Sequence, residues 1–440
     1  MKGFAWRRGR REYSLTDGAS DYEFYTDELL SQGMAVVLEG EMGVGKIAAT
    51  KVTVLEMDKE TKALQKVRER AAASASFPDK AAFSEEPAME RLWPRMKEAA
   101  LEITIAKKMG RPVLLRFHGD ADGICGAFAI SSLISCKVFQ QNSAIYSVKE
   151  ALRDMAFIGQ EGKAIAILLD FGSNEASREG RELLKAGGLD VLVIDHHPYE
   201  KEEAGIVNPA IDPEASRFSA GYLCAEVAVL CGMDKDKARE LAAIACSGDK
   251  SQVVPNGEDE AKKALVLDFL ASHISYGNNL DFYRKVMEKK ELFSSIAQQA
   301  NETIEEAAGK AMRGMKKSEE NGLTVASFSL EGIAKSGEWP PSSKITTRIF
   351  DKLKGEKALV CVGQTERSII IRLDDKAAER GISANALAEK LKLSMADFVE
   401  GGGGHVRAGA IRAREGFAKE VLNELLREIS TVAGGSQVQE

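Results

Sequence analysis

The stretch Phe117-His118-Gly119-Asp120-Ala121-Asp122-Gly123 begins with the last residue of an apolar run at residues 113–117. That run has the length and composition of a buried β-strand. Three polar side chains then alternate along the chain, so an extended backbone points His118, Asp120 and Asp122 to one side. Imidazole and carboxylate groups gathered on one side of a strand end are typical of metal ligands.

Two further apolar runs, residues 165–169 and 191–194, also end in polar groups. The first is followed by Asp170-Phe171-Gly172 and the second by Asp195-His196-His197-Pro198. Helical stretches separate the runs, and this alternation predicts a doubly wound α/β domain with a parallel sheet. A single Asp at a strand end is ordinarily a turn or capping residue, but three strand ends that agree favour a ligand site.

The residue types at these strand ends indicate which metals the site would take. Carboxylates combined with imidazoles suit Mn²⁺, Mg²⁺ or Zn²⁺, and the absence of Cys ligands disfavours a structural zinc site. A carboxylate that is shared between two ions can hold them about 4 Å apart, as hydrolytic two-metal sites require. We therefore expect two divalent ions, with Mn²⁺ favoured and Mg²⁺ as the alternative.

These motifs, in this order, resemble the DHH phosphoesterase superfamily. The stretch Ala242-Ala243-Ile244-Ala245-Cys246-Ser247-Gly248-Asp249 resembles the family's helix that leads to a final metal-binding aspartate. Gly401-Gly402-Gly403-Gly404-His405, followed by Arg407 and Ala408-Gly409, resembles the glycine-rich signature of the DHH-associated C-terminal domain. The resemblance covers residues of about 111–430, with motif order and strand context in agreement.

The resemblance implies a role for each matching residue. One ion would take His118, Asp120 and Asp170, and the other would take Asp122, Asp170, His196 and Asp249, which makes Asp170 the bridge. Asp195 would fix the orientation of a histidine, and His197 would lie near the scissile phosphate. A water activated by both ions would then attack the phosphorus atom.

Substrate contacts are expected from the C-terminal region. The glycines Gly402, Gly403 and Gly404 allow backbone N–H groups to approach a phosphate closely, and His405 beside them would act in substrate binding and catalysis. The resemblance also implies a phosphate contact for Arg372, although composition alone makes an exposed strand arginine equally plausible. Arg407 belongs to the same substrate-binding group.

The resemblance is strongest to RecJ-like single-strand exonucleases of archaeal type, so we expect hydrolysis of single-stranded DNA or RNA. The length of the chain and its extra N-terminal module favour a polymer substrate. A small-nucleotide phosphodiesterase of the nanoRNA, pAp or cyclic dinucleotide type is the first alternative. The second alternative is a catalytically silent DHH scaffold in a replication or repair complex, whose proteins would then be partners.

The chain of 440 residues is long enough for several domains. We expect a β-module with an OB-like barrel as its candidate fold, two helical segments, the doubly wound domain and a smaller C-terminal α/β domain. The expected bounds are 1–60 for the β-module, 61–108 for a helical connector, 109–257 for the DHH domain, 258–318 for a helical linker, 319–432 for the DHH-associated domain and 433–440 for a tail.

Composition excludes some functions. The net charge of -7 provides no global attraction to nucleic acid, so such binding needs a local patch. No stretch approaches the ~20 apolar residues of a membrane span, and the scattered cysteines indicate a reduced, cytoplasmic protein. The basic cluster at residues 7–11 is interpreted equally well as a phosphate grip or a solvated terminus.

A second glycine-rich stretch, Gly40-Glu41-Met42-Gly43-Val44-Gly45-Lys46, has the spacing of a phosphate-binding loop. Ile47 stands where the Mg²⁺-binding hydroxyl of that loop is required, and β-branched residues follow it. We therefore predict a glycine hairpin and no ATP binding.

Overall fold

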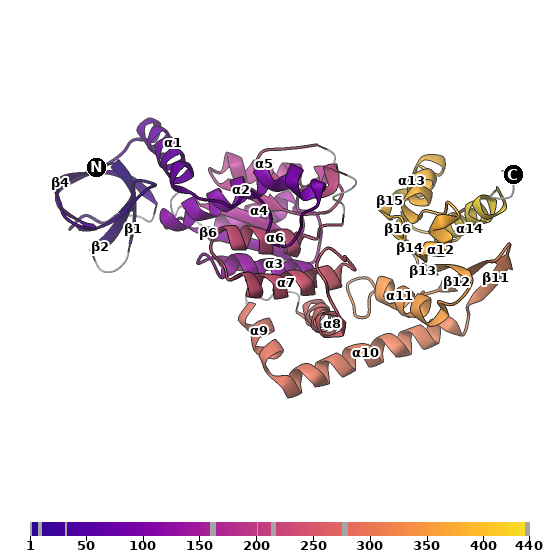
Figure 1. Cartoon of the computed structure of the whole chain (residues 1–440). Helices are drawn as coiled ribbons and strands as arrows, with labels where there is room; N and C mark the ends of the chain where they lie inside the picture. The colour runs from indigo at the N-terminus through magenta and orange to yellow at the C-terminus, as the bar shows by residue number, and fades with distance from the viewer. Residues whose placement is uncertain are drawn as a thin grey trace. The chain divides into compact units, whose positions relative to one another are not determined.

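The computed structural model describes residues 2–7, 11–30, 33–158, 164–199, 201–212, 217–274 and 280–435. The chain divides into two compact units, Met1–Lys290 and Glu291–Glu440, whose elements are labelled in Figure 1. The first unit holds a β-barrel, two connecting helices and an α/β domain. The second holds a mixed sheet with helices packed on it.

The N-terminal module is a closed barrel. Within the described residues it has five strands in the order β1-β2-β3-β5-β4, and β1 closes the barrel by pairing with β4. Apolar side chains such as Tyr13, Leu15 and Phe24 fill its interior. A five-stranded barrel agrees with the expected OB-like module. Its strands are β1 (Lys2–Arg7), β2 (Glu12–Thr16), β3 (Asp21–Tyr25), β4 (Met34–Met42) and β5 (Lys46–Val54).

The glycine-rich stretch around residue 43 is the turn between β4 and β5. These strands pair antiparallel, and the Gly43 N–H donates to the Lys46 carbonyl at 2.8 Å. A strand therefore begins at Lys46, where a phosphate-binding loop would begin its helix. The predicted glycine hairpin is confirmed.

Two helices, α1 (Met57–Ser74) and α2 (Pro87–Lys108), connect the barrel to the α/β domain. Phe4 of the barrel is fully buried in a cluster that includes Val67 of α1 and Ile105 of α2. Arg70 of α1 also forms an ion pair with Asp17 of the barrel at 2.6 Å. Apolar packing and charge therefore both attach the barrel to its connector.

The α/β domain is built on a parallel sheet with helices on both faces (Figure 1). Five strands of the described chain form it in the order β10-β9-β8-β6-β7, so the strand order reverses between β6 and β8. The predicted doubly wound domain is confirmed. Its strands are β6 (Val113–His118), β7 (Lys137–Gln141), β8 (Ile165–Leu169), β9 (Asp190–Ile194) and β10 (Ile206–Val207). Its helices are α3 (Ala121–Ser131), α4 (Val148–Ile158), α5 (Arg178–Ala186), α6 (Ala220–Leu230) and α7 (Lys235–Gly248), and α8 (Glu258–His273) and α9 (Leu280–Glu288) follow.

Gly221 allows α6 to approach α3 closely. A Cβ atom at this position would lie 2.6 Å from the Asp122 carbonyl oxygen and 2.7 Å from the Ala245 Cβ atom, so no side chain fits. The close approach places the backbone N–H groups of Ala220 and Gly221 at 2.8 Å from the Asp122 carboxylate. Helix packing therefore positions one of the predicted ligands.

The second unit begins with α10 (Lys290–Met312), which lies at the unit boundary. Its described residues form a six-stranded sheet in the order β11-β12-β13-β14-β16-β15. One face packs on α10 and α11 through Ala308, Ile345 and Ile349, and the other face packs on α12 to α14. The predicted C-terminal α/β domain is confirmed. Its elements are β11 (Lys316–Glu320), β12 (Leu323–Ser329), α11 (Ser342–Leu353), β13 (Ala358–Gln364), β14 (Ser368–Leu373), α12 (Asp375–Glu379), α13 (Ala384–Ser394), β15 (Val399–His405), β16 (Ala408–Ala413) and α14 (Ala418–Gly435). None of the helices in the described residues has both the length and the apolar character needed to cross a membrane.

Gly221→Ala tests the close approach of the helices. We expect it to lower the free energy of unfolding by about 1–3 kcal/mol because the added methyl group overpacks a filled contact. Gly309→Ala is the matched control, since Gly309 also lies inside a helix but has open space around it. The control should raise stability by up to about 1 kcal/mol. Equal effects of the two substitutions in urea denaturation would contradict this packing.

Candidate metal centre

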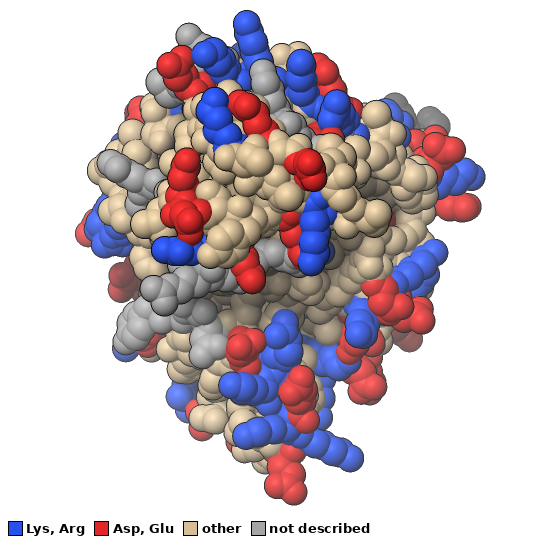
Figure 2. Space-filling view, turned by 90° about the vertical axis from the view of Figure 1, so that its left-hand side faces the viewer, with Lys and Arg blue, Asp and Glu red and all other residues tan. Residues whose placement is uncertain are grey.

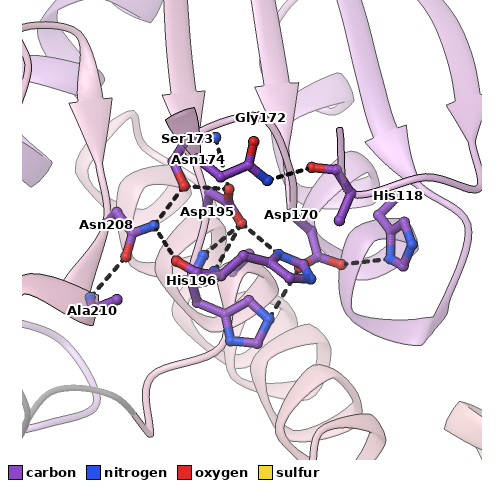
Figure 3. Close-up of polar contacts among 12 residues, drawn as sticks. His118, Asp170, Gly172, Ser173, Asn174, Asp195, His196, Asn208 and Ala210 are labelled. Atoms are coloured by element: carbon purple, nitrogen blue, oxygen red, sulfur yellow. Dashed lines mark hydrogen bonds and ion pairs between the residues drawn. The ribbon is translucent and has the colours of Figure 1, made fainter. Parts of the chain in front are cut away.

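Three strand ends meet at the carboxyl edge of the parallel sheet. β6 ends at His118, Asp170 follows β8, and His196 lies just after β9. Because β8 lies between β6 and β9, Asp170 stands between the two histidines (Figure 3). The structure therefore brings together side chains that are far apart in the sequence.

The first cluster consists of His118, Asp120 and Asp170. The His118 Nδ1 atom lies 2.7 Å from Asp120 Oδ2 and 3.3 Å from Asp170 Oδ2. One donor atom from each of the three residues lies within 4.8 Å of the others. This is the set that the sequence resemblance assigned to one ion.

The second cluster consists of Asp122, His196 and Asp249. The His196 Nε2 atom lies 3.3 Å from Asp249 Oδ2, 3.8 Å from Asp122 Oδ2 and 3.2 Å from Asp170 Oδ1. Asp249 reaches the cluster because it caps the C-terminus of α7. All four residues assigned to the second ion are therefore in one place.

Asp170 presents one carboxylate oxygen to each cluster. Its side chain is 1% exposed, and neither oxygen accepts a hydrogen bond from the described residues. Its φ angle of 62° lies in the left-handed region, which non-glycine residues seldom adopt. The nearest polar groups to its two oxygens are imidazole nitrogens at 3.2–3.3 Å, and a cation on each side would give this buried carboxylate closer partners. The donor set thus fits two divalent ions that share Asp170.

Two backbone N–H groups hold the Asp122 carboxylate in position. Its two oxygens accept the hydrogen bonds from Ala220 and Gly221 at the start of α6, and its side chain is 1% exposed. These bonds fix the carboxylate in position and leave a lone pair on each oxygen for a cation. The N-terminus of α6 therefore orients this candidate ligand.

The charges of the cluster shift several pKa values. Burial alone would lower the pKa of His118 and His196, but nearby carboxylates, chiefly Asp120 and Asp249 respectively, raise both well above the usual range. Desolvation and the Asp249 and Asp170 charges raise the pKa of Asp122. Although the Asp249 side chain is 27% exposed, desolvation in the cluster raises its pKa to about 6. Without a metal, the cluster therefore holds protons near neutral pH.

Asp195 is buried and holds the segment that carries the histidines. Its carboxylate accepts hydrogen bonds from the His196 and His197 backbone N–H groups at 2.7 and 3.1 Å, and from Ser173 Oγ at 2.6 Å. Its Oδ1 atom also lies 2.8 Å from His197 Nδ1. Burial would raise the pKa of Asp195, but the His197 and Ser173 contacts outweigh burial and lower it. The histidine whose ring Asp195 orients is therefore His197.

Gln140 supports the loop that carries His118 and Asp120, and the sequence analysis did not identify it. Its amide nitrogen lies at 2.9–3.0 Å from the Asn142 side chain and the Ala271 and Ile274 carbonyls, and its oxygen accepts from the Tyr283 hydroxyl. A Cβ atom at Gly119 would lie 2.7 Å from that amide nitrogen. No local signal identifies Gln140, because apart from Asn142 its partners lie in or directly after α8 and in α9.

Asp268 of α8 supports the same loop from another side. Its Oδ1 atom accepts a hydrogen bond from the Ala121 N–H at 2.7 Å, at the first residue of α3. The loop between the two aspartates of the motif is thereby fixed to α8. An aspartate in a helix interior gave no sequence signal for this role.

The glycine-rich signature forms β15 at one edge of the second sheet. Gly402, Gly403 and Gly404 pair with β16, and His405 lies opposite Ala408. Ala408 lies in turn opposite Arg372 on β14. Arg372, Ala408 and His405 therefore form one row across three strands, with their side chains on one face of the sheet.

The two predicted arginines have different environments. Arg372 is half-buried and donates to Thr347 of α11 at 3.2 Å. Arg407 is exposed and forms an ion pair with Asp375 at 2.7 Å. Of the N-terminal basic cluster, Arg11 forms an ion pair with Asp27 at 2.7 Å, whereas the Arg8 and Arg10 positions lie outside the described residues.

Metal binding should displace protons from the cluster. The raised pKa values of His118, His196 and Asp249 mean that protons compete with the cation, so Mn²⁺ affinity should rise with pH from about pH 6 upward, where Asp249 loses its proton. Calorimetric titration with Mn²⁺ in two buffers of different ionisation enthalpy measures the released protons. Binding heats that depend on neither buffer nor pH would contradict the assigned cluster.

Tyr283→Phe tests the support of the ligand loop. Removal of the hydroxyl deprives the Gln140 side-chain oxygen of its hydrogen bond, so we expect Mn²⁺ affinity to fall by a factor on the order of ten. Tyr13→Phe is the matched control, because it also removes a buried, hydrogen-bonded hydroxyl, which in this case lies in the barrel and makes two hydrogen bonds. The control should leave Mn²⁺ affinity unchanged, and equal Mn²⁺ affinities for the two variants would disprove the role of Tyr283.

Known proteins resemble this chain in sequence and in fold. An uncharacterized protein of Methanocaldococcus jannaschii, MJ1198, is 24% identical over 475 aligned positions, which cover 91% of this chain and 62% of that protein. The chain thus spans less than two thirds of this curated relative. Among solved structures, the DHH domain of a protein described as a member of a family of ribosomal proteins has a TM-score of 0.72 at 23% identity, covering 85% of this chain and 99% of that one.

RecJ of Thermus thermophilus, in complex with Mn²⁺, has a TM-score of 0.50 at 16% identity, and the match covers 84% of this chain and 59% of RecJ. Residues 112–248, which carry the three strand ends and α3 to α7, match the model of the DHH family, N-terminal domain. The first unit of this chain therefore carries a segment that matches the DHH family, and the chain is similar in fold to RecJ.

Proposed function

We propose that this protein is a metal-dependent phosphodiesterase that hydrolyses single-stranded nucleic acid. The observation that carries this proposal is the position of Asp170, whose two buried oxygens face two separate groups of candidate ligands. The DHH-family match supports the assignment to phosphoester chemistry. The RecJ structure that resembles this chain contains Mn²⁺, which supports manganese as the metal.

Two groups of residues would hold two ions, and Asp170 would belong to both groups. His118, Asp120 and Asp170 would hold one ion, and Asp122, Asp170, His196 and Asp249 would hold the other. When bound, two divalent ions lower the pKa of a water molecule and neutralise charge on the phosphoryl oxygens.

His197 is suited to contact the phosphate of the substrate. Its Nδ1 atom is bonded to Asp195, which fixes the ring and leaves Nε2 as the atom that can contact a substrate. Burial would lower the pKa of His197, but its hydrogen bond to Asp195 outweighs burial and raises the pKa, which favours the protonated ring. A charged imidazole at this position donates to a phosphoryl oxygen and offsets the negative charge that builds up during attack.

The row of Arg372 and His405 on the second sheet is proposed to bind further phosphates. Gly403, two residues before His405 on β15, leaves backbone uncovered near this row, since a Cβ atom there would meet no atom nearer than the Asn385 side chain at 3.9 Å. A charged guanidinium beside glycine backbone is a favourable setting for a phosphate group.

Nucleic-acid binding in this proposal relies on local sites. Among the described residues on the face shown in Figure 2, basic and acidic side chains are interspersed. Such a face does not attract a polyanion uniformly, in keeping with the net charge of -7. The barrel supports a polymer substrate, because barrels of this strand number bind oligonucleotides in many proteins.

Purified protein incubated with Mn²⁺ and 5′-labelled single strands tests this function. We expect mononucleotide release from long DNA or RNA strands, and a loss of rate of at least about 10³-fold in Asp170→Ala. Asp259→Ala, at an exposed position in α8, is the control and should retain the wild-type rate.

The products distinguish the alternatives. Cleavage of dinucleotides without cleavage of long strands would point to a small-nucleotide phosphodiesterase. The absence of any phosphodiester hydrolysis with either Mn²⁺ or Mg²⁺ would overturn the proposed enzymatic function and favour a catalytically silent DHH scaffold.

A further inference from the structure

β11 forms an open edge of the second sheet. Among the described strands it pairs only with β12, and Figure 1 shows it at the outer end of this sheet. All five of its side chains, from Lys316 to Glu320, are exposed. An edge strand of this kind presents backbone N–H and C=O groups that can pair with another strand.

The sequence of β11 is complementary in charge to its own reverse. It is Lys316-Lys317-Ser318-Glu319-Glu320, so an antiparallel pair centred on Ser318 places each Lys opposite a Glu. Opposite charges that face each other across two strands stabilise the pair, whereas like charges destabilise it. The parallel, in-register arrangement would place Lys on Lys and Glu on Glu and is therefore disfavoured.

The backbone of β11 also suits this register, because the residues that would pair direct their N–H and C=O groups away from β12. The two-residue turn Asn321-Gly322 has φ angles of 50° and 73°, so Glu320 and Leu323 form the hydrogen-bonded pair that closes the hairpin. Alternation along the strand then directs the N–H and C=O groups of Lys317 and Glu319 away from β12. In the register centred on Ser318, Lys317 of one copy lies opposite Glu319 of the other. Each of these two pairs exchanges two backbone hydrogen bonds.

We propose that β11 pairs antiparallel with β11 of a second copy of this chain, through a two-fold axis at Ser318. The second sheets of the two copies then form one continuous sheet. Glu319 already lies beside Lys357 of its own chain, and pairing places it between that lysine and the partner's Lys317. Charged residues on an edge strand normally prevent pairing with foreign strands, so this sequence rejects most partners and accepts its own copy.

The interface is small, which sets the expected affinity. One strand pair buries less area than the ~1,200 Å² at the lower limit of stable complexes, so we expect a dissociation constant in the micromolar range, on the order of 10 μM. Screening of the Lys–Glu pairs by salt should weaken the dimer.

Charge exchange on β11 tests this interface by sedimentation equilibrium at low salt, from about 1 to about 300 μM protein. We expect the wild type to dimerise, and both Lys316→Glu/Lys317→Glu and Glu319→Lys/Glu320→Lys to remain monomeric by themselves. An equimolar mixture of the two variants should form a heterodimer, because every opposing pair is then again Lys with Glu. Lys392→Glu/Lys419→Glu is the control. It makes the same change in net charge as Lys316→Glu/Lys317→Glu, but at exposed helical positions, and should dimerise as the wild type does.

Two results would overturn the proposal. A wild type that stays monomeric over the whole concentration range excludes the interface. Dimerisation of the Lys316→Glu/Lys317→Glu variant with the wild-type constant places the contact elsewhere. Circular dichroism of each variant verifies that the exchanged charges leave the fold intact.

Discussion

The candidate site depends on one carboxylate, Asp170, placed between two imidazoles. Sheet order imposes this position, because β8 has β6 on one side and β9 on the other, and each neighbour contributes a histidine at its end. The left-handed backbone at Asp170 and its two oxygens without hydrogen bonds are unfavourable for the fold alone. They become favourable if cations occupy the space beside both oxygens.

The surrounding residues keep the unfavourable cluster assembled. The start of α6 holds Asp122, Asp195 holds the segment with His196 and His197, and Gln140 with Asp268 holds the loop between β6 and α3. Protons can offset part of the repulsion among the carboxylates, as the raised pKa of Asp249 indicates. A cation does so more completely, because it interacts with several carboxylates at once. The same arrangement thereby favours metal binding and makes it dependent on pH.

The candidate metal ligands at the strand ends could be predicted from the sequence, whereas most of the residues that hold them in place could not. Buried parallel strands are continuous apolar runs, so the strand ends that carry His118, Asp170 and His196 could be located from composition alone. Asp249 was reached only by family resemblance, because its contact with His196 depends on how α7 packs. Gln140 and Tyr283 could not be predicted, since their partners lie more than a hundred residues apart in the sequence. The glycines of β15 were recognised as a close-approach motif, but their pairing with β16 follows from the register of the sheet.

Asp170 would hold two metal ions at once, one at each carboxylate oxygen. Electron paramagnetic resonance of the protein loaded with Mn²⁺ can detect this sharing, because two Mn²⁺ ions bridged by one carboxylate are magnetically coupled. We expect a coupled spectrum from two ions per chain, which is lost in Asp170→Asn. A spectrum that shows only isolated Mn²⁺ at full occupancy, or that is unchanged in Asp170→Asn, would show that Asp170 does not join two ions.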